Sequence, residues 1–267
     1  MKNKYIIGLI IFLLAIFTPI MVLAAEKEDK ESNKNDYEVP SHVLDIAKEN
    51  TYPNSNEDEE VVEPSELTQE LIESAEVNIT NPNLIKMLNE SSIEPSPIGF
   101  GYRGLIFLGR WPLNYESGDT NINWEYQKIN VNELNNIGGK DNQKLNFNQQ
   151  TQKEIKGALT NKIANPDDVK RMIIITSKQK TKLPLSYTTT IGAGTKKANS
   201  YAVPPQKYGY LHAFAPAINE KGKVTFGEVY IELKGSKKSL VIKNVTKQGI
   251  GAWIPIQDHV SFSFELK

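Results

Sequence analysis

The stretch 222–264 constrains the fold of this chain more than any other, because its pattern is typical of strands joined by short turns. Apolar residues at alternate positions of 260–264 give the two-residue period of a strand with one buried face. Upstream, the apolar positions change parity at Gly227, where a β-bulge is expected. Residues 235–238 then predict a hairpin turn. Together these signals predict an antiparallel sheet.

Most of the remaining chain has the same pattern of strands and turns, with roughly eight to ten strand signals and turns rich in Gly and Pro. Helix starts are predicted at Ser65 and at Asn81-Pro82, each followed by an apolar stripe at helical spacing. After Asn165-Pro166, a run of three isoleucines suits either a helix or a strand. The predicted class is mainly β (α+β), an antiparallel sheet sandwich or open barrel with two or three short helices, mostly N-terminal.

Prolines and polar clusters predict where individual strands end. Residues 100–111 and 124–129 are expected to be two strands that pair across a loop. The expected breaks in the strands are Pro112, the loop at 116–121, Pro216 and the turn at 219–222.

The N-terminus has the pattern of an export signal. Lys2 and Lys4 precede an apolar run at 5–17, and Pro19 follows shortly before small residues. We expect residues 1–25 to be a signal peptide cleaved after Ala24 or Ala25. The alternative is an uncleaved anchor, because the apolar stretch is just long enough to span a bilayer.

Residues 26–64 are polar and acidic, which predicts a flexible tether, with residues 39–47 as a short docking segment within it. Residues 65–267 are then expected to form a single β-rich globular domain. Residues 26–66 hold fourteen acidic and four basic residues, whereas 67–267 hold 25 basic and 18 acidic ones. The domain is therefore mildly basic and its leader acidic.

A basic domain outside the cell is attracted to anionic wall polymers or to a phospholipid surface, and another envelope protein is a further possible partner. No nucleic acid is expected there. The alternative is an ordinary solvated surface, because no run of five like charges occurs in the domain.

No motif for cofactor or metal chemistry stands out. Residues 192–197 superficially resemble a phosphate-binding loop but lack the full glycine and lysine pattern, so a hairpin turn is favoured. The three histidines, His42, His212 and His259, show no ligand spacing, and the chain has no cysteine. We therefore expect no cofactor and no metal.

Two sequence patterns are weakly catalytic in character. Asp258-His259 would be half of a hydrolytic triad if a serine converged on it, but the serine elbow G-x-S-x-G is missing, which favours an exposed turn. Glycoside hydrolysis needs two carboxylates at a fixed separation, and the candidate residues are Glu116, Asp119, Glu228 and Glu232. Nothing in the sequence shows that they converge, so no catalytic residue is assigned.

Five aromatic residues form the best candidate ligand surface, because several flank expected loops and flat rings with a polar edge bind sugars or partner chains. They are Trp111, Tyr115, Trp124, Tyr126 and Trp253. The alternative is that they are core residues of a β-rich domain.

Several blocks of the sequence resemble the YfkD-like family of exported proteins from Bacillus-type bacteria. They are residues 108–117, 180–187, 219–224 and 249–255, together with Asn50-Thr51-Tyr52-Pro53. The resemblance covers most of the expected mature chain and implies secretion, but it implies no activity, cofactor or catalytic residue.

The sequence therefore predicts an exported, extracytoplasmic protein of unknown activity, held at the outer face of the membrane or in the wall, or secreted. A non-catalytic binding or structural role at the cell envelope is favoured over an enzyme. The alternative is a hydrolase acting on cell-wall glycan or peptide.

Overall fold

The computed structural model describes residues 37–55, 61–93 and 103–267. The expected signal peptide, its cleavage after Ala24 or Ala25, the start of the tether and the first residues of the strand expected from Phe100 lie outside these ranges. Of the helices in the described part of the chain, none has the length and apolar content needed to cross a bilayer.

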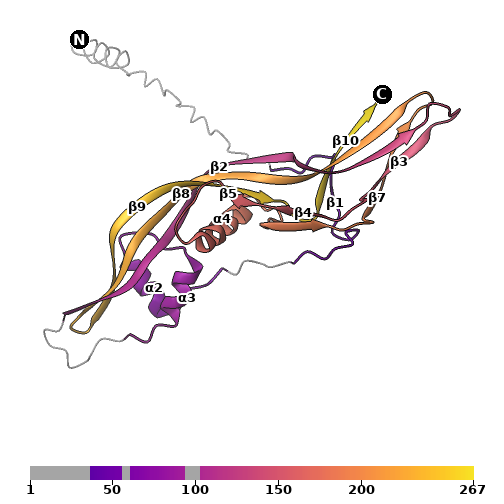
Figure 1. Cartoon of the computed structure of the whole chain (residues 1–267). Coiled ribbons are helices and arrows are strands. Elements are labelled where there is room, and N and C mark those ends of the chain that lie inside the picture. The colour runs from indigo at the N-terminus through magenta and orange to yellow at the C-terminus, as the bar shows by residue number, and fades with distance from the viewer. Residues whose placement is uncertain (1–36, 56–60, 94–102) are drawn as a thin grey trace, which may run out of the picture. The chain divides into compact units, whose positions relative to one another are not determined.

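Long antiparallel strands form the main sheet (Figure 1). The central strand is β8, which pairs with β2 on one side and with β9 and then β10 on the other. The short strands β1 and β5 extend the sheet beside β10 and β9, giving six strands within the described residues. Their bounds are β1 Val43–Asp45, β2 Arg103–Asn135, β5 Ala158–Leu159, β8 Tyr208–Lys234, β9 Lys237–Pro255 and β10 His259–Leu266.

Two small two-stranded sheets accompany the main sheet. One pairs β3 (Gln143–Asn148) with β7 (Lys196–Val203), and the other pairs β4 (Lys153–Lys156) with β6 (Thr188–Ile191). Their inward residues join those of β8 and β10 in one hydrophobic cluster that includes Phe147. Burial of this shared cluster is what joins the small sheets to the large one.

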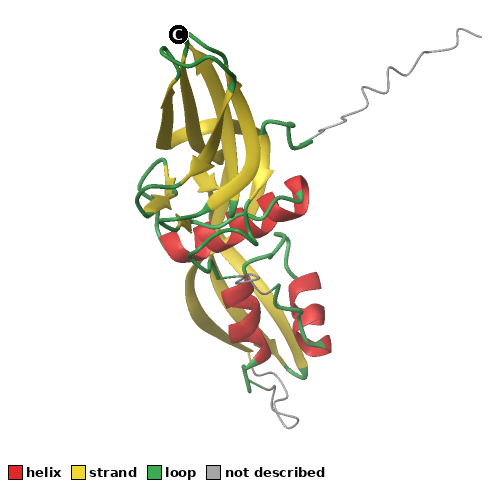
Figure 2. Cartoon of the chain, turned by 90° about the vertical axis from the view of Figure 1, so that its right-hand side faces the viewer, coloured by secondary structure: helices red, strands yellow, loops and turns green. Residues whose placement is uncertain are grey.

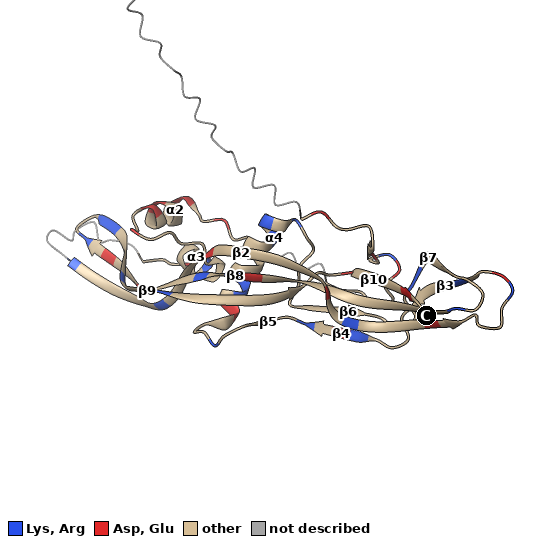
Figure 3. Ribbon diagram, turned by 90° about the horizontal axis from the view of Figure 1, so that it is seen from above, with Lys and Arg blue, Asp and Glu red and all other residues tan. Residues whose placement is uncertain are grey.

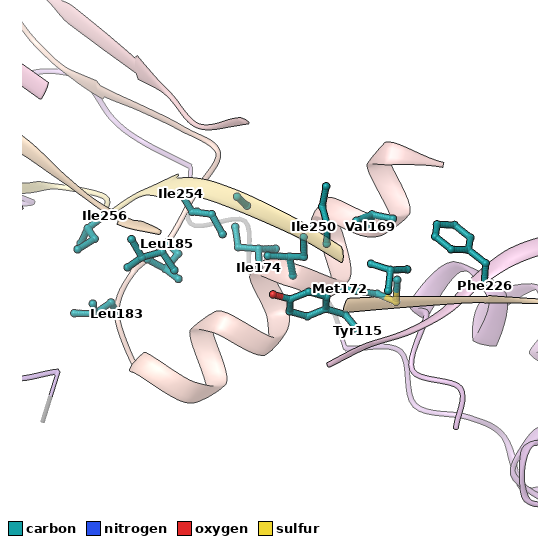
Figure 4. Close-up of a cluster of buried hydrophobic side chains, with 14 residues drawn as sticks. Tyr115, Val169, Met172, Ile174, Leu183, Leu185, Phe226, Ile250, Ile254 and Ile256 are labelled. Carbon is teal, nitrogen blue, oxygen red and sulfur yellow. The ribbon is translucent and has the colours of Figure 1, made fainter. Parts of the chain in front are cut away.

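Three helices lie beside the long strands in the described chain (Figure 2). Helix α2 (Glu66–Glu73) begins at the Ser65 cap and α3 (Pro82–Asn89) begins at the Asn81 cap, as the sequence predicts. Helix α4 (Pro166–Thr181) shows that the isoleucine run is helical. Its buried residues pack with β8 and β9 in a second cluster (Figure 4).

The predicted class is confirmed: the fold is mainly β, antiparallel, with few helices. The register of β8 against β9 shifts at Gly227, which confirms the predicted bulge. The hairpin turn after Lys234 is also confirmed, with Gly235 at a φ of 60°, a left-handed conformation that glycine adopts easily.

The predicted strand breaks are wrong, because β2 and β8 run through all of them. Pro112 is tolerated because β2 pairs with β8 alone in the described sheet, and the register of this pair is interrupted between Pro112 and Asn114. Pro216 lies where the partner of β8 changes from β10 to β9. The polar segments 116–121 and 219–222 are strands because they pair with each other.

Within the segment expected to be a tether, residues 43–46 dock where the docking segment 39–47 is expected, whereas the contacts of residues 50–55 were not predicted. Strand β1 pairs with β10, and Ile46 is fully buried. Two asparagines then fix the following segment: the amides of Asn50 and Asn54 each donate to the carbonyl oxygen of Thr190 and to a carboxylate oxygen of Asp258. These hydrogen bonds offset the conformational entropy that is lost when the polar segment becomes ordered.

Candidate functional site

Four of the five aromatic residues selected from the sequence are distributed over three core clusters instead of lining one groove. Trp111 packs beside α3, and its indole nitrogen donates to the carbonyl oxygen of Leu108 at 2.9 Å. Tyr115 is 7% exposed and Trp124 is partly buried, both in the cluster around α4. These three rings therefore contribute to packing.

Of this set, Tyr126 and Trp253 are the two described residues whose rings contact each other. Their rings stack with centroids 4.9 Å apart, and both are half-buried. Tyr126 also packs against the cluster shared with the small sheets. Because each ring covers a face of the other, the pair offers little open ring surface to a ligand.

A buried carboxylate that the sequence analysis missed lies beside Tyr115 (the ring labelled in Figure 4). Glu220 is fully buried on β8 and accepts hydrogen bonds from the hydroxyls of Tyr115, at 2.9 Å, and Thr120. Burial, reinforced by the neighbouring Glu220, raises the pKa of Tyr115, so its hydroxyl remains a donor. The ring of Tyr115 reaches Glu220 by lying across Gly222, where a Cβ would collide with its hydroxyl. Because the Glu220 carboxylate is closed to solvent, we interpret this network as a stabilising element of the core.

The weak catalytic patterns do not converge on a reactive site. One oxygen of Asp258 accepts from Asn50 and Asn54, and His259 Nδ1 lies 2.6 Å from the backbone oxygen of Gln257. The four candidate carboxylates have separate partners, which are Lys247 for Glu116, Asn121 for Asp119, Tyr230 and Asn244 for Glu228, and Arg103 for Glu232. In the described ranges no group of three His, Asp or Glu side chains is placed to hold a metal ion.

Residues 192–197 form a turn between β6 and β7, but these two strands pair with other strands, so the turn does not close a hairpin. Thr195 and Asn50 occupy the turn: the Asn50 side-chain oxygen accepts from the amide of Gly192 at 2.9 Å. A Cβ at Gly192 would collide with Thr51. The turn therefore holds the N-terminal segment instead of a phosphate.

The strongest candidate for a binding surface is the outward side of the sheet where β8 turns into β9. Residues 105–108 of β2 are four consecutive apolar residues, and on a strand two of them must face away from the core. Ile106 and Leu108 pack toward α2 and α3, whereas Leu105 and Phe107 are 46% and 56% exposed. This sequence signal for an outward apolar surface was missed because the pairing of the strand was assigned wrongly.

We call this surface the hairpin face. In the register of β2, β8 and β9, the residues that share it are Arg103, Leu105, Phe107, Arg110, Glu228, Tyr230, Glu232, Lys234, Lys237, Ser239, Val241 and Lys243. Five of them are basic and two are acidic. Figure 3 shows the basic residues in blue toward the end of this hairpin.

Both carboxylates of the hairpin face are bonded, but only Glu232 is paired with a cation. Glu232 pairs with Arg103 at 3.2 Å, and Glu228 accepts from the Tyr230 hydroxyl at 2.9 Å. The hydrogen bond to Glu228 raises the pKa of Tyr230. Lys234 and Lys237 form no ion pair with any residue that the structure describes. The face therefore presents unpaired positive charge beside exposed apolar side chains.

A second outward surface is a row of aromatic side chains on the other half of β8. Tyr208, Tyr210, His212 and Phe214 point to one side, with ring centroids 5.0–6.5 Å apart. The first three rings stack on one another, so their faces are occupied and mainly their edges reach solvent. Neighbouring charges are balanced, because Lys128 and Lys267 are accompanied by Glu133 and Glu265.

An open groove of about 560 Å³ lies on the β3–β7 sheet. It exists because β7 has three residues opposite the single residue Phe147 of β3. Of its two lysines, Lys197 already donates to the backbone oxygen of Asp45 and to Glu49. The groove therefore offers one uncommitted lysine, Lys196, and less positive charge than the hairpin face.

Comparison with known proteins agrees with the resemblance seen in the sequence. A profile described as YfkD-like protein matches residues 40–267, which include β1 and every later element. The chain is also 52% identical over 266 residues to the uncharacterized protein YfkD of Bacillus subtilis (strain 168), an alignment that covers 100% of this chain and 98% of that protein. Neither description names an activity or a ligand. Because both matches extend across all the described β-strands of the chain, the chain belongs to the YfkD-like family.

Proposed function

We propose that this chain is an exported, non-catalytic binding protein of the cell envelope, and that its hairpin face engages an anionic, phosphate-bearing component there. The observation that carries the proposal is the concentration of charge on this face. Five cations share it with two carboxylates, and both carboxylates are already bonded within the face. A surface with a net positive charge attracts a polyanion over several ångströms and raises the rate of encounter.

Export is supported by the N-terminal sequence: Lys2 and Lys4, the apolar run at 5–17 and the small residues at Ala24 and Ala25. The absence of cysteine fits a fold that depends on burial alone in an oxidising compartment. Phosphate-bearing polymers and lipids are the anions that a basic surface meets outside a cell of this kind.

A binding role is favoured over a hydrolase because the groups that hydrolysis requires are committed elsewhere. Asp258 holds the N-terminal segment, and each of the candidate carboxylates contacts a different side chain. Glu220, the one fully buried carboxylate among the described residues, is out of reach of any substrate. No observation in the described chain favours the hydrolase.

Fractionation of cells that produce the full chain tests the proposal. We expect the chain outside the cytoplasm, cleaved by protease added to intact protoplasts, and released from the envelope fraction by high salt because the attachment is electrostatic. An intact precursor in the cytosol would refute export. An exported chain whose leader has been cleaved, and whose retention does not change with salt, would refute binding through the hairpin face.

A further inference from the structure

The hairpin face arranges its charged and apolar residues in rows across the three strands. One row is Leu105, Glu232 and Ser239, and the next is Phe107, Tyr230 and Val241. The flanking rows are Arg103, Lys234 and Lys237 at the hairpin end and Arg110, Glu228 and Lys243 at the other. Exposed apolar side chains thus lie between two rows that each carry cations.

We infer that the hairpin face docks on an anionic lipid bilayer, with Leu105 and Phe107 entering the interfacial region and the flanking cations contacting lipid phosphates. This inference rests on the proposed function and names the component that the face binds. Peripheral binding of this kind combines buried apolar area with attraction to anionic headgroups, and neither contribution alone holds a protein firmly.

The apolar residues are what distinguish a bilayer from a soluble wall polymer. A polyanion in water is attracted by Lys234 and Lys237 but gains nothing from the side chain of Phe107, which is 56% exposed. A bilayer interface removes that apolar surface from water, as well as that of Leu105, which is 46% exposed. The juxtaposition therefore fits a surface that is both anionic and apolar.

The charges on the face suit lipid phosphates. Lys234 and Lys237 are exposed and unpaired within the described chain, so no internal ion pair must break on binding. Lys243 lies over the ring of Tyr230, 5.1 Å from its centroid, and Tyr230 in turn contacts Phe107. The Arg110 guanidinium donates to Thr246 and is held at the edge of the face.

Vesicle flotation tests the inference with the chain recovered from the extracytoplasmic fraction. The probes are mixed phosphatidylglycerol–phosphatidylcholine vesicles, pure phosphatidylcholine vesicles and soluble polyglycerol phosphate. Three double variants are compared with the parent chain: Lys234→Gln with Lys237→Gln, Leu105→Ser with Phe107→Ser, and the control Lys144→Gln with Lys153→Gln on the small sheets. The control removes the same charge from exposed positions away from the face.

We expect binding to the mixed vesicles that weakens as salt rises, and little binding to pure phosphatidylcholine. At about fivefold per lysine near an anionic surface, the hairpin lysine pair should weaken partitioning about 25-fold. The serine pair should weaken vesicle binding at least about tenfold while leaving any binding of polyglycerol phosphate unchanged. The control pair should stay within about twofold of the parent chain.

The outcomes separate the inference from the function on which it rests. Two results overturn bilayer docking but leave an anionic envelope partner in place. One is binding of polyglycerol phosphate without binding of vesicles. The other is vesicle binding that is unchanged in the Leu105→Ser, Phe107→Ser variant. Binding to neither probe overturns both. Thermal unfolding of each variant shows that it is folded, and the lysine pair lies at an exposed hairpin, so the lysine comparison remains decisive if the serine pair unfolds.

Discussion

Removal of one buried hydroxyl should cost this protein far more stability than removal of its exposed counterpart. Tyr115 and Tyr230 each donate to a glutamate at 2.9 Å, but Tyr115 is buried against Glu220 while Tyr230 lies on the open hairpin face. Tyr115→Phe leaves an oxygen of a fully buried carboxylate without a donor. Tyr230→Phe leaves Glu228 open to water and still bonded to Asn244.

The expected loss of stability in Tyr115→Phe follows from the burial of Tyr115 and Glu220. A hydrogen bond to a charged group contributes about 1.5–3 kcal/mol, and a buried acceptor left without its donor also loses its solvation. We therefore expect Tyr115→Phe to lower the free energy of unfolding by about 2–3 kcal/mol. In a body of this size that corresponds to a fall in Tm of about 5–10 °C. Tyr230→Phe should leave Tm unchanged within error.

Urea unfolding followed by circular dichroism and by tryptophan fluorescence measures the difference, provided that both probes report the same transition. The reasoning is refuted if the two variants unfold at the same midpoint, or if Tyr115→Phe is as stable as the parent chain. Either result would mean that the hydrogen bond from Tyr115 to Glu220 does not stabilise the fold.

Three further predictions follow from neighbouring contacts. Gly222→Ala should destabilise the chain by about 1–3 kcal/mol, because its Cβ would collide with the backbone oxygen of Glu116 and with the Tyr115 hydroxyl. Gly249→Ala, with no atom within 4 Å of its Cβ, should not shift the urea midpoint. Asp258→Ala removes the acceptor of the Asn50 and Asn54 amides, which hold the N-terminal segment. Limited proteolysis should therefore cut within residues 37–55 sooner than in the parent chain. The exposed control Asn121→Ala should be cut at the same rate as the parent chain. Because the pKa of Tyr115 is raised in the folded chain, the unfolded chain loses the hydroxyl proton at a lower pH than the folded chain does. The free energy of unfolding should therefore fall as pH rises above about 10. In urea titrations at a series of pH values, Tyr115→Phe should show a smaller fall than the parent chain.

Local signals in the sequence predicted those parts of the fold that depend on local chemistry. The caps at Ser65 and Asn81, the bulge at Gly227 and the turn at Gly235 need only their own neighbours, and the structure has all of them. The helix after Pro166 was ambiguous because a run of isoleucines satisfies both periods.

The errors concern features that depend on strand partners. Residues 219–222 have the composition of a turn, yet they pair on both sides with β2 and β9, and this tertiary context outweighs their weak strand preference. The buried role of Glu220 could not be predicted either, because its donors Tyr115 and Thr120 lie about a hundred positions earlier.

The candidate surface was missed for a related reason. An alternating pattern marks a strand with one wet face, but 105–108 is apolar at every position, and only the register with β8 shows which two side chains face outward. The five aromatic residues selected from the sequence were chosen because they flank expected loops. Trp111, Tyr115, Trp124 and Tyr126 all lie within or beside β2, which has no loop at 116–121.

Hydrogen–deuterium exchange with and without anionic vesicles tests the central claim most directly, because it reports where on the chain the envelope component binds. The account predicts slower exchange on vesicle binding at residues 103–110 and 237–243, and unchanged exchange at the aromatic row, residues 208–214. Protection of the aromatic row with none at the hairpin face would contradict it.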